Sequence, residues 1–229
     1  MLTACGGSSD AGSEPVTVFA ASSLTEVFQA IDPDAEYNFA GSDDLATQIK
    51  EGASPDVYAA ASSKYPDELF AAGLIEQPQI FATNKLVLIV PKENPAGIHS
   101  VADLGQDGVK LVVGAEGVPI GDYTRKVLEN MAASNVLENV VSEENDVKGV
   151  VSKVSLGEAD AGFVYATDVK PVADNVTAIE LPGEAQAKVE YPIGVVKGTD
   201  AEEAARAFVE LVRGPEGRQA LGQAGFGLP

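Results

Sequence analysis

Cysteine, histidine and tryptophan are scarce in this sequence, and their scarcity excludes several kinds of site. The 229 residues include one cysteine, one histidine and no tryptophan. A single cysteine cannot build a disulfide framework or a cysteine-ligated zinc or iron–sulfur site. No apolar run approaches the about 18 to 20 residues of a membrane-spanning helix. The composition therefore predicts a globular protein without thiolate-bound metals.

Positive charge is also scarce. The chain has 15 Lys and Arg residues against 35 Asp and Glu residues, a formal net charge of −20. The field of such a chain repels phosphate, which excludes nucleic acid and anionic membrane surfaces as electrostatic partners. A hydrophobic content of 45% is ordinary for a folded protein, so the acidity does not indicate disorder.

Catalytic signatures are missing too. The sequence has no G-x-S-x-G elbow, no G-x-x-x-x-G-K-[ST] phosphate loop and no G-x-G-x-x-G after a strand. His99 lies in a Pro/Gly-rich stretch typical of a surface loop. The acidic pairs Asp43-Asp44 and Glu143-Glu144 are more typical of solvated faces than of acid–base catalysis. We therefore expect no enzymatic activity, no resident cofactor and no site for a free metal ion.

The single cysteine has informative neighbours. Leu2-Thr3-Ala4-Cys5 matches the bacterial lipobox, in which cleavage before Cys5 is followed by its lipidation, and a flexible Gly/Ser-rich stretch follows. A signal peptide needs charged and apolar stretches before the cleavage site, so we expect the natural precursor to begin upstream of Met1. Residues 1–15 are thus predicted to be a lipid-anchored tether; the alternative is a free cysteine in a frayed terminus.

Strands alternate with helices along the rest of the chain. Strand-like apolar runs lie at 15–21, 37–40, 56–60, 85–90, 110–114, 161–165 and 191–196. Helical patterns lie at 23–31, 45–50, 67–72, 100–104, 123–133, 146–156 and 201–212. This alternation predicts an α/β protein with parallel sheets. Because the pattern restarts after 90 and the C-terminal segment returns, we expect two lobes, one of residues 16–84 and 188–229 and one of residues 85–187 inserted into it.

Small and hydroxyl residues gather where the predicted strands pass into helices. They are Ser22-Ser23 (in the capping-box pattern S-x-x-E with Glu26), Gly41-Ser42, Val118-Pro119-Ile120-Gly121, and Asn145-Asp146 before Val147. Helix starts carry unsatisfied N–H groups and a positive dipole end, and in open α/β sheets they lie where ligands bind. One such junction is explained by capping alone. Four of them, with Tyr165 at a strand end, indicate an anion site made of neutral donors.

These junctions also carry a family resemblance. The motifs are Val18-Phe19-Ala20-Ala21-Ser22-Ser23-Leu24-Thr25, Phe39-Ala40-Gly41-Ser42, Gly52-Ala53-Ser54-Pro55-Asp56-Val57, Val118-Pro119-Ile120-Gly121, Asp146-Val147-Lys148-Gly149, Gly162-Phe163-Val164-Tyr165-Ala166-Thr167-Asp168 and Val189-Glu190-Tyr191-Pro192-Ile193. In this order they resemble the molybdate-binding proteins of ABC importers over nearly everything after Pro15. The resemblance implies a two-lobed type II periplasmic-binding-protein fold with the ligand cleft between the lobes.

The resemblance also implies a ligand and its contacts. Ser23 and Ser42 are expected to give a hydroxyl and a backbone N–H each, Ile120 and Val147 a backbone N–H, and Tyr165 its phenol, to molybdate or tungstate. For Tyr165 the alternative is a structural role in the core. The implied protein is an extracytoplasmic monomer that is attached to the membrane only by its lipid and delivers its ligand to the transmembrane subunits of an ABC permease.

The chemistry of such a site narrows the ligand. A site that only donates suits a fully deprotonated dianion, whereas monohydrogen phosphate would turn its O–H toward donors at a cost of about 1–3 kcal/mol. Sulfate differs only in size, so a receptor for sulfate or another oxyanion is the alternative, and an enzyme on the same fold is a remote one. Asp43 and Asp44 depart from the family pattern. In the first turn of a helix each stabilises it by about 0.3–1 kcal/mol, but each opposes a nearby dianion.

Overall fold

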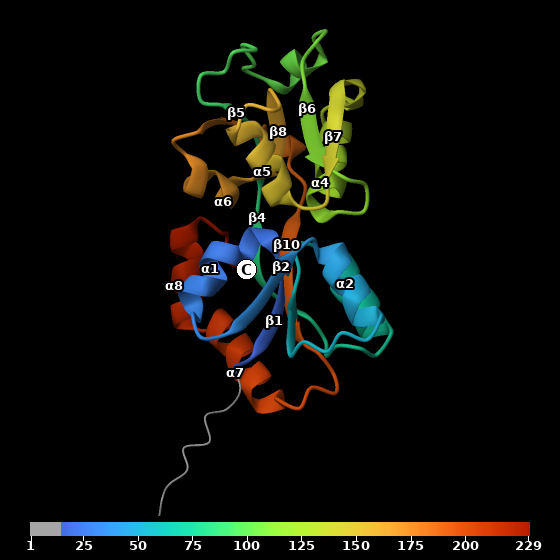
Figure 1. Ribbon diagram of the computed structural model, residues 1–229, viewed down its shortest axis with the longest axis vertical. Coiled ribbons are helices and arrows are strands. Elements are labelled where there is room, and N and C mark those ends of the chain that lie inside the picture. Colours follow the sequence, from blue (N-terminus) through green and yellow to red (C-terminus); the bar gives the residue numbers. More distant parts are fainter. Residues whose placement is uncertain (1–14) are drawn as a thin grey trace, which may run out of the picture.

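The computed structural model describes residues 15–229, whose strands form two separate five-stranded sheets. The first sheet has the order β2-β1-β3-β10-β4 and contains β1 (Thr17–Ala21), β2 (Glu36–Ala40), β3 (Val57–Ala59), β4 (Gln79–Asn84) and β10 (Val189–Val195). The second has the order β7-β6-β8-β5-β9 and contains β5 (Leu86–Pro91), β6 (Leu111–Gly114), β7 (Val140–Glu144), β8 (Ala161–Tyr165) and β9 (Val176–Glu180). We call the lobes built on them lobe I and lobe II; Figure 1 shows one above the other.

Each sheet contains both parallel and antiparallel strand pairs, so the prediction of parallel sheets is correct for some strands and wrong for others. Strand β1 runs parallel to β2 and β3, and β6 runs parallel to β7 and β8. Strand β10 is antiparallel to β3 and β4, and β5 is antiparallel to β8 and β9. Parallel neighbours in a sheet need a long crossover connection, usually a helix. Strands β5 and β10 instead come from the crossings between the lobes, and β4 leads into β5 through Lys85 alone.

Helices cover the faces of both sheets. Lobe I carries α1 (Thr25–Ile31), α2 (Ser42–Lys50), α3 (Lys64–Ala71), α7 (Glu202–Arg213) and α8 (Pro215–Ala224), and lobe II carries α4 (Pro119–Asn130), α5 (Val147–Ser155) and α6 (Ala166–Val169). A short 3-10 turn, η1 (Ser22–Leu24), joins β1 to α1. None of the helices within residues 15–229 is long and apolar enough to cross a membrane.

Several elements escape the sequence pattern for identifiable reasons. Strands β4, β7 and β9 have half-exposed faces and so contain no continuous apolar run. Helix α4 begins at Pro119, four residues before the predicted start, because proline is favoured in the first turn, where no N–H is needed. Pro215 follows the end of α7 but also starts α8, for the same reason.

The C-terminal helices complete the core of lobe I. In α7 the buried residues Ala205, Phe208, Val209 and Val212 follow the spacing of one helical face. The ring of Phe208 meets that of Phe28 edge-on at 5.6 Å, and Phe28 is fully buried in α1. This packing fixes α1, and with it the turn that follows β1.

Candidate functional site

A small cavity lies between the lobes, and both lobes line it. The lining residues are Ala21, Ser22, Ser23, Ala40, Gly41, Ser42 and Ala61 from lobe I and Val118, Pro119, Ile120, Asp146, Val147 and Tyr165 from lobe II. Its volume of about 20 Å³ exceeds the roughly 10–15 Å³ that one water molecule requires, so it suits one small polar guest. The structure thus brings the five predicted residues Ser23, Ser42, Ile120, Val147 and Tyr165 together.

The starts of helical segments from both lobes converge on this cavity. Ser23 lies in η1 after β1, and Ser42 is the first residue of α2 after β2. In lobe II, Ile120 is the second residue of α4 and Val147 the first of α5. Backbone N–H groups at these positions have no partner within their own helix, and the dipole ends of the helices are positive. The cavity therefore attracts an anion although no Lys or Arg lines it.

The Ser42 hydroxyl is oriented by a backbone group. Its Oγ accepts a hydrogen bond from the Ala61 N–H at 3.0 Å, and the carbonyl of Ser42 accepts one from the Tyr58 hydroxyl at 2.6 Å. Because the Ala61 N–H can only donate, the proton of Ser42 is free for an acceptor in the cavity.

The Ser23 hydroxyl does not cap a helix. It lies 3.0 Å from the hydroxyl of Tyr191. The capping box predicted for Ser23 and Glu26 is wrong, because α1 begins only at Thr25 and Glu26 instead pairs with Lys148 of lobe II at 2.8 Å.

Tyr165 presents a buried hydroxyl without a partner. The residue is 1% exposed at the end of β8, and within residues 15–229 nothing hydrogen-bonds its phenol oxygen. Burial raises the pKa of Tyr165 well above its ordinary value, so the phenol keeps its proton. A buried hydroxyl left unpaired costs about 1–3 kcal/mol, which makes Tyr165 a donor suited to a guest in the cavity.

The lobes touch one another around the cavity. Across the gap the Tyr65 hydroxyl donates to the Gly117 carbonyl, and Lys64 lies 3.5 Å from Asp122. Gly41 passes so close to lobe II that a Cβ there would lie 2.5 Å from the Asn145 carbonyl oxygen. The described conformation is therefore a closed one.

A buried ion pair that the sequence reading missed lies beside the site. Asp168 in α6 is 2% exposed, and its Oδ1 lies 3.4 Å from Lys148, which also pairs with Glu26. Burial raises the pKa of Asp168 to about 6, against the opposing effect of Lys148. Both Asp168 and Lys148 belong to motifs near predicted ligands, but no pattern in the sequence shows that their side chains meet.

Asp43 lies outside the lining of the cavity. Its side chain is half-buried, and its Oδ1 has no hydrogen-bond partner within the described part of the chain. Burial, with smaller contributions from Asp44 and Asp122, raises the pKa of Asp43. The helix stabilisation expected for this carboxylate is therefore offset by its burial.

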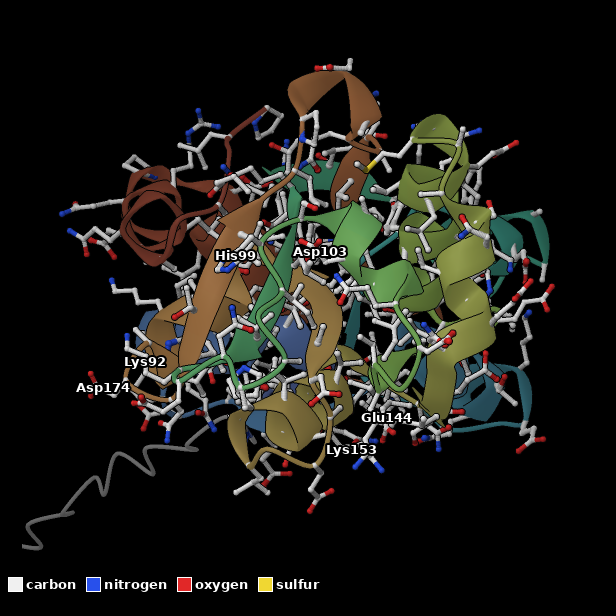
Figure 2. All side chains as sticks on the ribbon, turned by 90° about the horizontal axis from the view of Figure 1, so that it is seen from above. Lys92, His99, Asp103, Glu144, Lys153 and Asp174 are labelled. Carbon is white, nitrogen blue, oxygen red and sulfur yellow. The ribbon has the colours of Figure 1, made fainter. Side chains whose placement is uncertain are left out.

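His99 and the Glu143-Glu144 pair, which were considered for acid–base catalysis, do not line the cavity. His99 is exposed on a loop of lobe II next to Asp103, as Figure 2 shows in the view from above. Glu143 pairs with Arg125 at 2.6 Å, and Glu144 lies 3.4 Å from Lys153. Among residues 15–229 no cluster of His, Cys, Asp and Glu side chains has the arrangement of a metal site. Cys5 lies outside the described residues.

Comparison with known proteins places this chain among binding proteins. The family model for bacterial extracellular solute-binding proteins matches residues 16–227, and the chain belongs to this family. The molybdate-binding protein ModA of Mycobacterium tuberculosis is 40% identical over 100% of this chain and 93% of its own length. ModA of Escherichia coli is 30% identical over 97% of this chain and 93% of its own length.

Solved structures with the same fold include receptors for different oxyanions. The periplasmic molybdate-binding protein of Azotobacter vinelandii has a TM-score of 0.82 and 22% identity, over 93% of this chain and 99% of its own. The sulfate-binding protein SubI of Mycobacterium tuberculosis has a TM-score of 0.80 and 16% identity, over 93% of this chain and 86% of its own. At these identities the likeness shows the two-lobed type II periplasmic-binding fold.

The buried carboxyl of Asp168 generates a prediction about pH. Its folded pKa of about 6 lies above the ordinary value of about 3.9, so between these values the folded protein binds more protons than the unfolded one. This group therefore stabilises the fold at low pH and loses that contribution as pH rises through about 6. We therefore expect the melting temperature of Asp168→Asn, minus that of the original protein, to increase as pH rises from about 4 to 7.

The matched control is Asp174→Asn, which changes an exposed carboxyl of the same lobe. Its melting curve against pH should run parallel to that of the original protein. Parallel curves for Asp168→Asn as well would show that the Asp168 carboxyl does not titrate abnormally.

Proposed function

We propose that this chain is the extracytoplasmic receptor that captures molybdate and delivers it to the transmembrane subunits of an ABC importer. The observation that carries the proposal is the cavity itself, in which helix starts, two serine hydroxyls and the unpaired Tyr165 phenol meet from opposite lobes. The 40% identity to a molybdate-binding protein over the whole chain supports the same ligand.

The donors of the cavity favour a fully deprotonated tetrahedral dianion. Only Asp146 among the lining residues carries a carboxylate, and that carboxylate already accepts a hydrogen bond from the Gly149 N–H at 2.9 Å. A protonated oxyanion whose O–H faced these donors, rather than the second oxygen of Asp146, would lose about 1–3 kcal/mol. Tungstate has the same charge and nearly the same size as molybdate, and we propose that it binds as well.

Sulfate is the second candidate, because a sulfate-binding protein shares the fold. Its identity of 16% supports only the fold, whereas the relatives at 30% identity and above are molybdate-binding proteins. An enzyme on this fold has less support, because neither His99 nor the Asp43-Asp44 pair lines the cavity.

The proposal extends to how the receptor is held and how it closes. We propose that Cys5 carries a lipid, that residues 6–15 tether a monomer to the outer face of the cell membrane, and that the receptor needs no cofactor. The boundaries between the lobes are proposed to lie between residues 84 and 85 and between residues 187 and 188. The β4–β5 connection and the segment before β10 would then act as the hinge.

A thermal-shift screen with molybdate, tungstate, sulfate and phosphate tests the function. A ligand at 1,000 times its dissociation constant stabilises a protein by about 4 kcal/mol, which raises the melting temperature measurably. We expect large shifts with molybdate and tungstate and a small one with sulfate. A protein that responds to no oxyanion would contradict the proposal, and a preference for sulfate would replace it with the second candidate.

The Tyr165 hydroxyl is predicted to bind the ligand directly. Tyr165→Phe keeps the ring in its packing but removes a hydrogen bond to a charged group, worth about 1.5–3 kcal/mol. Molybdate affinity in calorimetry should fall about 10- to 150-fold. Tyr37→Phe is the matched control, because the Tyr37 hydroxyl bonds the carbonyls of Phe28 and Asp32 in lobe I, away from the cavity lining. Equal affinity in both variants would assign Tyr165 a structural role.

Because Gly41 lies so close to lobe II, we predict that a side chain at position 41 would prevent the lobes from closing fully. In Gly41→Ala the new methyl would lie 2.5 Å from the Asn145 carbonyl oxygen, so the lobes must stay further apart. We expect weaker molybdate binding and less compaction on ligand addition in small-angle X-ray scattering. Gly183→Ala is the control, because a Cβ there meets no atom within 4 Å. Full compaction of Gly41→Ala would contradict the closed arrangement.

Asp43 is predicted to weaken binding from outside the site. Its half-buried carboxylate lies one residue from Ser42 and repels a dianion through a partly desolvated environment. Asp43→Ser should tighten molybdate binding, and the exposed Asp44→Ser should tighten it less, because solvent and salt screen its charge. Weaker binding in Asp43→Ser would mean that the carboxylate helps to hold the ligand, by accepting a proton from it or by binding an associated cation, and would contradict the molybdate assignment.

A further inference from the structure

Tyr191 lies behind the cavity without lining it. It belongs to β10 and is fully buried. Its hydroxyl lies 3.0 Å from the Ser23 hydroxyl, and its ring meets that of Tyr165 edge-on at 5.8 Å. Tyr191 therefore contacts one proposed ligand residue from each lobe.

The neighbours of Tyr191 decide the direction of its hydrogen bond. Asn84, the last residue of β4, accepts the Lys85 N–H through its Oδ1 at 2.9 Å, and this bond fixes the orientation of the amide. The Asn84 Nδ2 then faces the Tyr191 oxygen at 3.5 Å and the Thr167 Oγ1 at 2.9 Å. Because the amide nitrogen only donates, the Tyr191 proton must point elsewhere, and within residues 15–229 its other hydrogen-bond partner is Ser23.

We propose that Tyr191 is a positioning residue that orients the Ser23 hydroxyl to donate to the bound oxyanion, with the orientation set by Asn84 and Thr167 at the hinge. The inference deepens the proposed function and rests on it. Tyr191 does for Ser23 what the Ala61 N–H does for Ser42, because each fills an acceptor position of a serine oxygen and leaves the serine proton for the cavity.

Burial keeps Tyr191 in the protonated form that this role requires. It raises the pKa of the phenol well above its ordinary value, and the nearby Asp168 carboxylate adds to the shift. The phenol therefore keeps its proton, and can donate it in a hydrogen bond, at neutral pH.

The link to the hinge follows from where Asn84 and Thr167 lie. Asn84 ends β4 in lobe I, directly before the crossing, and Thr167 lies in α6 of lobe II. Their 2.9 Å contact spans the two lobes beside the crossing. The donor direction of Ser23 is thereby tied to the closed arrangement, in which the ligand is held.

The first test is a double-mutant cycle with molybdate, measured by calorimetry. Tyr191→Phe should weaken binding about 3- to 10-fold, the factor of one neutral hydrogen bond. If Tyr191 acts through Ser23, the same change in a Ser23→Ala background should cause no further loss. An equal loss in both backgrounds would overturn the inference. Thr167→Val, which removes the hydroxyl that Asn84 contacts, repeats the cycle with a second variant, and it should likewise weaken binding only where Ser23 is present.

The second test uses selectivity, which a merely structural role of Tyr191 would not change. Without the Tyr191 proton, both lone pairs of the Ser23 oxygen are free and its orientation is no longer held, so it accepts the proton of monohydrogen phosphate more readily. The affinity ratio of molybdate to phosphate at mildly alkaline pH should therefore fall in Tyr191→Phe and stay unchanged in Tyr37→Phe, the control already described. An unchanged ratio in Tyr191→Phe would overturn this inference but leave the proposed function standing. An original protein that bound no molybdate would overturn the proposed function and this inference with it.

Discussion

The structure depends on one constraint: an anion site without cations must be assembled from backbone N–H groups at the starts of helical segments, and no single helix offers enough of them. Here η1 and α2 supply donors from lobe I, and α4 and α5 supply them from lobe II. The carboxyl ends of strands in both sheets must therefore face one another. Two lobes joined by crossing strands satisfy that requirement, and the hinge proposed between them would allow the ligand to enter and leave.

Neutral donors also explain how a chain with a net charge of −20 can bind a dianion. The repulsion from distant surface carboxylates is screened by salt, whereas the dipoles at the cavity act within a few ångströms of the ligand and in a partly desolvated space. The buried carboxylate of Asp168 is paired with Lys148, which in turn pairs with Glu26 across the lobes. This arrangement limits the opposing charge near the cavity and adds a contact between the lobes.

The sequence predicts which residues line the cavity better than it predicts the residues that orient them. Ser23, Ser42, Ile120 and Val147 stand at strand-to-helix junctions, which turn and capping residues mark locally. The partners that orient them come from far along the chain: Tyr191 lies 168 residues from Ser23, and Ala61 lies 19 residues from Ser42. Such pairs depend on the order and direction of the strands. The pattern of apolar runs does not reveal that order, as the antiparallel β5 and β10 show.

The cavity-lining donors and the residues that orient them are proposed to have different effects: the donors give affinity, and the orienting residues give selectivity. Helix starts and the Tyr165 phenol favour any tetrahedral dianion that fits, because a backbone N–H cannot tell one acceptor oxygen from another. Serine hydroxyls are different, since each can donate or accept. Donation into the cavity is favoured when another group donates to each serine oxygen, as the Ala61 N–H does for Ser42 and Tyr191 is proposed to do for Ser23. In the proposed arrangement, discrimination against protonated oxyanions thus rests in part on Tyr191, a residue of β10 that does not line the cavity.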